Sequence, residues 1–492
     1  MKPQIEGDLQ RITCGISNGA RWGNIALGNI VENIQHISSG PLTWSKYDVV
    51  IVGSGPSGVM AARTFAEKGQ AVLVLELGPV ASPGAIHRDH QAPYSMAYGA
   101  RGKLDTDPWT ACCVGGGMQF YDAITFRYRA EDLTASRFLA SDMEIDWPIS
   151  ISDLSEAYSE VESLLRVSGT SGHPEFQLSG RGRQLFASLE ELGMQPKRIP
   201  LAIDAPGEAS GCISCSACDE RVCPIGAKAS ILSRSLFYDE GLSGSIDVRY
   251  GIFVSRVLSS REAHIDGVEC FITFTADILN IPASKVILCA NAIQSAAVFL
   301  RSSSIHIGQP TLFRSGLIGK GLSFKISGYS TGYVGDIPSD FDGPHAGPHA
   351  TVFSDKFYSH ADVPTGLGGM IYEANLPTPN ENRKLLRLHY IAGEEPWSHN
   401  QIELTDSLDA NGVPRLKISY TNSQNDLDRI NFLAERSEDV LRSMGMINIH
   451  REPFQHGKAT CSSPCSSRAR SVVAVKAGRS SGGRSAIPAA PV

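Results

Sequence analysis

The stretch from residue 47 to residue 76 constrains this chain more than any other. YDVVIV (47–52) is a short apolar, β-branched run that is typical of a buried parallel strand, and it leads directly into GSGPSG (53–58). VMAARTFAEKG then has helical spacing and ends at Gly69, and AVLVLE predicts a second strand ending at Glu76. Strand, G-x-G-x-x-G, helix, strand and acid within about 30 residues predict a dinucleotide-binding βαβ unit.

Each part of this motif has a physical role. Gly53 permits a tight turn, Gly55 lets a pyrophosphate approach the backbone, and Gly58 lets the helix pack closely on the sheet. The helix N-terminus offers free N–H groups and a partial positive charge to the phosphates. Glu76 stands where an acid accepts hydrogen bonds from the adenosine ribose, which favours NAD or FAD over NADP.

Bulk properties set wider limits. A chain of 492 residues has room for two or three domains or one two-lobed unit, and its net charge of −7 gives no reason to expect nucleic-acid binding. The N-terminus lacks an apolar core of signal-peptide length, and no run approaches the roughly 18 apolar residues of a membrane helix, so we expect a cytoplasmic protein. Its eleven cysteines then indicate reduced thiols or metal ligands rather than disulfides.

Two further loops suggest chemistry. Three consecutive glycines, Gly115 to Gly117, mark a place where backbone lies against something flat or phosphorylated. GCISCSACDERVCPIGAKAS is a C-x2-C-x2-C-x4-C-P array that resembles the ferredoxin spacing with one extra residue; its cysteines are Cys212, Cys215, Cys218 and Cys223. Three interpretations stay open: reduced thiols in a packed loop, iron–sulfur ligands, or zinc ligands. Lys228, at the end of the loop, would pair with a flavin phosphate or form a surface ion pair.

The remaining periodic segments predict a second lobe. Residues 146–169 predict an amphipathic helix with Asp153 as its N-cap, and 426–445 predict a core helix that stops at Gly445. KLLRLHYIAG (384–393) and NQIELTD (400–406) alternate in the manner of antiparallel strands and predict a substrate platform. A further helix is expected around 24–36.

The order of these motifs resembles the glucose–methanol–choline (GMC) family of FAD-dependent alcohol oxidoreductases over roughly residues 47–461. The matching segments are GSGPSGVMAA…LELG (53–78), VGGGMQFYDAITFRYRAEDL (114–133), DWPISISDLSEAY (146–158), CPIGAKAS (223–230), KVILCANAIQSAAVFLRSS (285–303), LIGKGL (317–322), NQIELTDSLDANGVPRLKISY (400–420) and HGKATC (456–461). Two places depart from the family pattern: Tyr121-Asp122-Ala123 replaces a Trp-Gly-Gly-like turn, and Asn291 replaces a glycine. Asn is tolerable there because it enters left-handed backbone more easily than most residues.

The resemblance implies FAD, a two-lobed fold and oxidation of an alcohol by hydride transfer to the flavin. It places His456 as the base that takes the hydroxyl proton, a role that suits a histidine near neutral pKa. His450, His87 and His90 are expected to be strand or surface residues. The residues assigned to the cofactor are Gly53, Gly55, Pro56, Ser57, Gly58, Glu76, Gly115, Gly116, Gly117, Val254 and Ala290.

The end of the chain does not follow the family. Residues 462–492 hold five cations and no acid, aromatic, histidine or asparagine, so residues 1–461 carry 39 cations against 51 acids. VVAV (472–475) is the one strand-like run, and the composition otherwise predicts a disordered tail. A change of reading frame near codon 462 would produce this end, and the second catalytic residue that the resemblance implies would then be missing.

We therefore expect an α/β protein with a Rossmann-type FAD-binding lobe and a substrate lobe built from an antiparallel sheet and helices. The expected segments are a leader (1–46), the FAD-binding lobe (47–130, 205–320 and 451–461), the substrate lobe (131–204 and 321–450) and the tail (462–492). The leading function is oxidation of a polyol, sugar or aminoglycoside-type alcohol, with a small-molecule substrate and an undetermined electron acceptor. The alternatives are a catalytically impaired flavin-binding relative and a flavin/iron–sulfur electron-transfer subunit.

Overall fold

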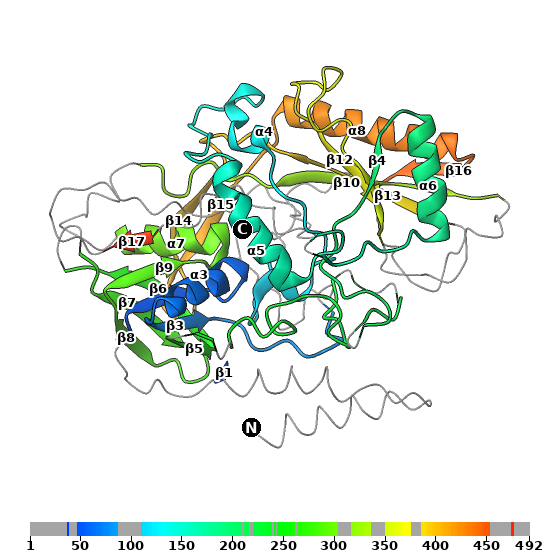
Figure 1. The fold of residues 1–492 in the computed structure, drawn as a ribbon. Coiled ribbons are helices and arrows are strands. Elements are labelled where there is room, and N and C mark those ends of the chain that lie inside the picture. The colour runs from blue at the N-terminus through cyan, green and yellow to red at the C-terminus, as the bar shows by residue number, and fades with distance from the viewer. Residues whose placement is uncertain are drawn as a thin grey trace.

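The computed structural model describes two lobes (Figure 1). Its described residues are 37–38, 47–86, 110–170, 172–208, 211–215, 218, 220–238, 241–242, 244–260, 264–303, 316–335, 350–374, 385–452 and 474–476. The predicted leader helix around 24–36, His87, His90 and His456 lie outside them.

The first lobe is built on a six-stranded sheet whose order is β1-β5-β3-β2-β9-β17. Its strands are β1 (Ile37–Ser38), β2 (Val49–Val52), β3 (Ala71–Glu76), β5 (Ser245–Tyr250), β9 (Lys285–Leu288) and β17 (Ala474–Lys476). Pairing is parallel except at β17, which joins β9 in the antiparallel sense. The predicted strands at 47–52 and 71–76 are therefore confirmed, and β2 stands at the centre with a neighbour on each side.

Alternate side chains of the central strands serve two different hydrophobic clusters. Val49 and Ile51 pack against α3 (Pro56–Glu67), while Val50 and Val52 pack against a three-stranded sheet. That small sheet has the order β6-β7-β8, with β6 (Ile252–Leu258), β7 (Gly267–Ile272) and β8 (Ile278–Pro282). α7 (Asn291–Ser303) also contributes to the second cluster. Because both faces of the parallel sheet are covered, its central strands β2 and β3 consist almost entirely of apolar residues.

The second lobe is built on a six-stranded antiparallel sheet of order β16-β10-β13-β12-β11-β4. Its strands are β4 (Pro196–Arg198), β10 (Lys325–Tyr333), β11 (Val352–Ser354), β12 (Gly369–Glu373), β13 (Leu385–Gly393) and β16 (Ile447–Arg451). α8 (Gln424–Ser443) lies along the outer side of this sheet (Figure 1), and α6 (Gly180–Glu191) joins the same hydrophobic cluster. The predicted helix at 426–445 is confirmed, and Gly445 follows it with φ +69°.

Two expectations for this region are wrong. β14 (Gln401–Leu408) pairs with β15 (Pro414–Ser419) in a separate hairpin, and Ile402 of that hairpin packs in the same cluster as Ile293 of α7. Asp153 lies in a 3-10 turn before α5 (Ser155–Leu165) and accepts hydrogen bonds from Ser150, so it does not cap the helix. The apolar face predicted for this helix is nevertheless partly or fully buried.

Candidate functional site

The Gly53–Gly58 turn lies where the topology predicts a ligand. β2 has the parallel neighbours β3 and β9 on its two sides, so the chain leaves in opposite directions there, and ligands bind at the carboxyl edge of such a switch point. Gly53 has φ +99°, and a Cβ on it would meet the carbonyl oxygen of Cys289 at 2.4 Å. A Cβ on Gly58 would meet the carbonyl oxygen of Gly53 at 2.0 Å, so α3 can pack this closely only because residue 58 has no side chain.

Ser54 connects the turn to the acid at the end of β3. Its backbone N–H and its hydroxyl both donate to Glu76 Oε2, at 2.9 and 2.6 Å, and the Gly78 N–H donates to Oε1 at 3.0 Å. Glu76 is buried, and burial raises its pKa although these hydrogen bonds oppose that shift. The sequence analysis did not identify Ser54, because the second position of the G-x-G-x-x-G motif is free to vary. Its side-chain hydroxyl was the one feature that could have indicated a role.

The triple-glycine loop packs on the same turn. The Gly115 N–H donates to the Ser54 hydroxyl at 3.1 Å, and a Cβ on Gly116 would lie 3.1 Å from the Cα of Gly55. Gly117 lies in the short 3-10 helix that follows, η1 (Gly116–Gln119). The structure thus brings together two glycine loops that are about 60 residues apart in sequence.

Ala290 and Val254 reach the same edge of the sheet from other strands. The Ala290 backbone nitrogen lies 2.9 Å from the Cβ position of Gly53. Tyr250 is the register partner of Glu76, so the turn from β5 into β6 starts beside the acid. Val254 is buried in β6 and shares a hydrophobic cluster with Val52 and Leu75, which lie near the ends of β2 and β3.

Asn291 shapes the second helix that starts at this edge. It has φ +53°, which confirms that Asn takes the left-handed conformation here. Its side-chain Oδ1 accepts from the N–H groups of Ile293 and Gln294, at 2.8 and 3.1 Å, and so caps α7. The N-termini of α3 and α7 consequently follow adjacent parallel strands, and both present positive helix ends to this edge.

These residues fit a bound FAD diphosphate and ribose. The Cβ position of Gly55 has no atom within 4 Å, so space is left beside the turn at the start of α3. The Glu76 carboxylate lies at the end of β3 beside the turn, where an acid accepts a hydrogen bond from an adenosine ribose. The Nε2 of Gln119 lies buried next to Gly115 and has no hydrogen-bond partner within the described part of the chain.

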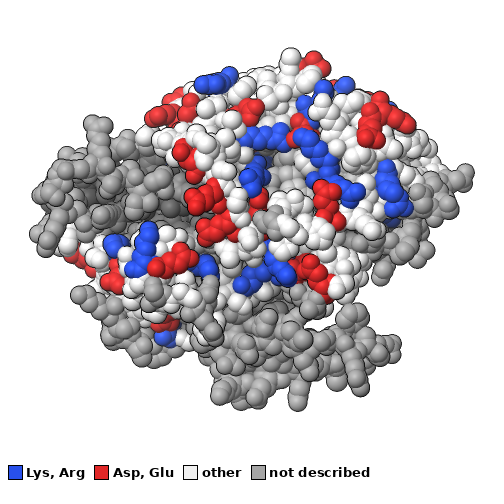
Figure 2. Space-filling model, in the orientation of Figure 1, with Lys and Arg blue, Asp and Glu red and all other residues white. Residues whose placement is uncertain are grey.

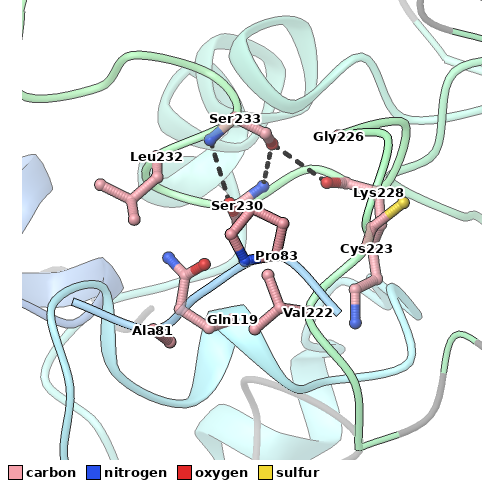
Figure 3. A pocket seen from close by; sticks show the side chains of 10 residues that line it. All are labelled: Ala81, Pro83, Gln119, Val222, Cys223, Gly226, Lys228, Ser230, Leu232 and Ser233. Atoms are coloured by element: carbon pink, nitrogen blue, oxygen red, sulfur yellow. Dashed lines mark hydrogen bonds between the residues drawn. The ribbon is translucent and has the colours of Figure 1, made fainter. Parts of the chain in front are cut away.

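A pocket adjoins the triple-glycine loop (Figure 3). It is lined by Ala81, Pro83, Gln119, Val222, Cys223, Gly226, Lys228, Ser230, Leu232 and Ser233. The backbone N–H of Ser230 and that of Ser233 each donate to the other residue's hydroxyl, at 2.8 and 3.0 Å, which fixes one wall. The Lys228 ammonium donates to the carbonyls of Tyr121, Cys218 and Arg221.

Lys228 therefore differs from both sequence-based expectations. It is only 2% exposed, so it does not lie at the surface, and its ammonium donates to three backbone carbonyls. The lysine ties the cysteine loop to the segment after the triple glycines. A spacing pattern cannot show this, because it depends on which carbonyls the fold brings together.

The four-cysteine loop consists of free thiols in the structure. Burial raises the pKa of Cys212 and of Cys218, and neighbouring cysteines contribute to both shifts, so the sulfurs lie near one another. A raised pKa favours the thiol over the thiolate that metals bind. Within the described residues no group of three or more His, Cys, Asp or Glu side chains is placed to hold a metal ion. The three interpretations of the loop, as reduced thiols, iron–sulfur ligands or zinc ligands, stay predictions.

The described chain stops just before the predicted base. β16 ends at Arg451, and Glu452 is the last described residue before the HGKATC segment that contains His456. His450 is exposed on β16, as expected for a strand or surface residue. β17 lies within the 462–492 segment that was expected to be a disordered tail. No described helix is long and apolar enough to cross a membrane.

A Rossmann-type lobe with this edge, facing an antiparallel platform, defines a two-lobed dinucleotide-dependent enzyme. The GMC oxidoreductase family model matches residues 143–325, and the FAD binding domain model matches residues 48–87. The chain is 32% identical to paromamine 6'-oxidase from Streptomyces fradiae over 435 residues, which cover 84% of this chain and 80% of that enzyme. It is 31% identical to 6'''-hydroxyparomomycin C oxidase from Streptomyces lividus, covering 87% and 83% of the two chains.

Solved structures agree on the fold. Pyridoxine 4-oxidase from Mesorbium loti superimposes with a TM-score of 0.54 at 15% identity, covering 81% of this chain and 80% of that one. Formate oxidase gives a TM-score of 0.54 at 13% identity, covering 84% of each chain. The chain belongs to the GMC oxidoreductase family and is an FAD-dependent alcohol oxidoreductase.

Proposed function

We propose that this enzyme oxidises the 6′-hydroxymethyl group of an amino sugar in an aminoglycoside to the aldehyde. The observation that carries the proposal is the identity of 31–32% over more than four fifths of the chain to two relatives whose names specify paromamine and hydroxyparomomycin C. The acidic excess of residues 1–461 supports it, because aminoglycosides are polycations and net charge steers oppositely charged ligands. Figure 2 shows acidic and basic side chains interspersed on one face, so the attraction comes from the net balance.

The cofactor would be held by the residues gathered at the switch point. Glu76 would accept from the ribose, and the backbone of Gly53–Gly58 and Gly115–Gly117 would lie against the diphosphate. Val254 and Ala290 would bound the cofactor from β6 and from the start of α7. When bound, FAD supplies the hydride acceptor for the alcohol carbon.

His456 is the proposed base for the hydroxyl proton. An imidazole that is neutral near pH 7 can take this proton as the carbon loses its hydride. The assignment rests on the HGKATC motif. The segment with His456 begins after Glu452, whose carboxylate pairs with Arg387 and whose backbone N–H bonds to Tyr329 of the platform sheet. The platform thus anchors the chain four residues before the base.

The experiment is anaerobic reduction of the yellow holoenzyme by paromamine, followed by flavin absorbance. We expect bleaching by paromamine and none by the same amino sugar lacking its 6′-hydroxyl. His456→Asn should retain FAD and be reduced about 100-fold or more slowly, since a general base contributes at least this much. His450→Asn is the matched control, because His450 is exposed six residues earlier, and its reduction rate should equal that of the unmodified enzyme.

Three results would contradict parts of the proposal. A yellow protein that paromamine does not bleach would exclude this substrate, and a failure with all polyols tried would indicate a catalytically impaired flavin binder. Equal reduction rates for His456→Asn and His450→Asn would remove His456 from the base role. Iron that co-purifies with the flavin would favour the electron-transfer alternative.

A further inference from the structure

The central strand of the platform sheet has two chemically different faces. Leu386, Leu388 and Tyr390 of β13 pack with α8 and α6 in one hydrophobic cluster. Ile391, on the opposite face, packs with Tyr372 in a cluster that includes Val59 of α3 and Ala227. Because side chains alternate along a strand, the odd-numbered side chains of β13 lie on the face opposite the α8 cluster. Figure 1 shows the FAD-binding lobe on that side of the sheet.

A row of polar side chains crosses this inner face. His389 is the register partner of Tyr329 on β10 and of Tyr372 on β12. The backbone N–H of Glu452 donates to the Tyr329 carbonyl at 2.9 Å, which extends the row to the end of β16. One level of the sheet thus carries Glu452, Tyr329, His389 and Tyr372 side by side.

The contacts along the row fix the imidazole of His389 rigidly. Its ring stacks on the ring of Tyr329, with centroids 4.4 Å apart and an interplanar angle of 15°. Its Nδ1 is hydrogen-bonded to the Tyr372 hydroxyl. The other face of Tyr329 is covered by Arg387, whose guanidinium carbon lies 3.5 Å from the ring centroid.

Arg387 is held in turn by Glu452. Nε and Nη2 of Arg387 donate to the two carboxylate oxygens at 2.8 and 2.6 Å, a bidentate pair in which the arginine side chain is only 13% exposed. Burial lowers the pKa of His389 well below its ordinary value, and the charges of Arg387 and Lys325 lower it further. The imidazole is therefore neutral at physiological pH.

One polar atom of the row is left without a partner. His389 is 2% exposed, yet its Nε2 has no hydrogen-bond partner among the residues that the structure describes. A buried polar atom without a partner costs about 1–3 kcal/mol, so a ligand hydroxyl that bonds to Nε2 would offset this cost. The stacked and hydrogen-bonded ring would hold this atom in a fixed position for such a partner.

We propose that His389 is a specificity-determining residue whose Nε2 hydrogen-bonds a ring hydroxyl of the substrate sugar, and that Tyr329, Tyr372 and Arg387 are positioning residues for its imidazole. This inference rests on the proposed function, because it assigns His389 to the binding of the amino-sugar substrate. A neutral imidazole suits a polyhydroxylated ring, since it contributes one hydrogen bond without adding charge to a site for a polycation.

The test combines enzyme variants with substrate analogues. His389→Phe retains the ring volume and removes both nitrogens, and His389→Gln keeps a polar group near the Nε2 position. With FAD retained, we expect His389→Phe to raise KM for paromamine about 10- to 100-fold, with a smaller change in kcat, and His389→Gln to raise it less. Paromamine analogues that each lack one ring hydroxyl identify the hydroxyl that Nε2 contacts. For the analogue that lacks this hydroxyl, wild type and His389→Phe should have the same kcat/KM, because the hydrogen bond is absent in both.

Tyr390→Phe is the matched control, because Tyr390 is the next residue of β13 and faces the α8 cluster, so its KM should not change. An unchanged KM for His389→Phe that retains FAD would overturn the inference. The same factor of loss in kcat/KM, relative to wild type, for every analogue would also overturn it. If His389→Phe does not fold, the same analogue series on His389→Gln decides. If wild type itself is not reduced by paromamine, the proposed function fails instead, which separates the two outcomes.

Discussion

Ser54 is the residue on which the two glycine loops depend. Its hydroxyl donates to Glu76 and accepts from the Gly115 N–H, and its side chain is fully buried. The Ser54 hydroxyl therefore holds Glu76 and the triple-glycine loop in a fixed arrangement before any cofactor binds. Such preorganisation reduces the ordering that a ligand must impose when it binds.

Ser54→Ala should consequently weaken FAD binding about 10-fold and lower the free energy of unfolding by about 1–3 kcal/mol, because the Gly115 N–H loses its acceptor in a buried site. Titration of apoprotein with FAD and urea unfolding measure the two quantities. Thr64→Ala is the control, since Thr64 is exposed on α3 and its hydroxyl bonds only within that helix. A Kd for FAD that is equal in both variants would contradict the role of Ser54.

At the scale of elements, α7 depends on one residue that does two things. Asn291 takes left-handed backbone and also caps the helix with its side chain. The helix start lies against Gly53 through Cys289 and Ala290, so an error there would displace the edge of the cofactor site.

Asn291→Ala should lose both contributions and destabilise the protein by about 2 kcal/mol, of which about half is the cap and half the left-handed conformation. Asn291→Gly keeps the backbone freedom, and glycine is a tolerable cap, so it should lie within about 0.5 kcal/mol of wild type. Urea unfolding of the apoproteins compares them. Equal stability of the two variants would show that the left-handed conformation carries no cost.

Elements specified by local patterns were predictable from sequence. β2, α3 and β3 follow from apolar runs and a glycine stop, and β13 and α8 from their periodicity. The hairpin of β14 was assigned to the wrong sheet, because alternation shows that a strand has two faces and not which strand it pairs with. Asp153 failed as a cap because a 3-10 turn precedes α5. The roles of Ser54, Lys228 and His389 depend on residues far away in sequence, and no local pattern encodes them.

At the scale of the whole molecule, Glu394 joins three segments. It follows β13, accepts from the Phe324 N–H at 2.7 Å and accepts from the Asn422 amide at 3.0 Å. It thereby connects the platform sheet to the start of β10 and to the segment between β15 and α8. Burial, with a smaller contribution from Asp426, raises the pKa of Glu394 to about 7.

This shift predicts a pH dependence of stability. Because the folded pKa lies above the ordinary value of 4.5, the protonated form is favoured in the native state, and ionisation of Glu394 opposes folding. This unfavourable contribution to the free energy of folding is absent below about pH 4.5 and fully present above about pH 7. The difference between the two pKa values corresponds to a full size on the order of 3 kcal/mol. Glu394→Gln cannot ionise, and the stability difference between variant and wild type should grow by this amount from about pH 4.5 to about pH 8. Urea unfolding at both pH values measures it, and parallel pH profiles would contradict it.

The alternation along β13 separates two selective pressures within one strand. Leu386, Leu388 and Tyr390 hold α8, whereas Arg387, His389 and Ile391 face the other lobe. Changes at the odd positions can retune which alcohol is accepted while the even positions keep the lobe folded. A library randomised at these three odd sites would therefore test substrate choice directly, with FAD retention as the check that each variant at these largely buried positions still folds.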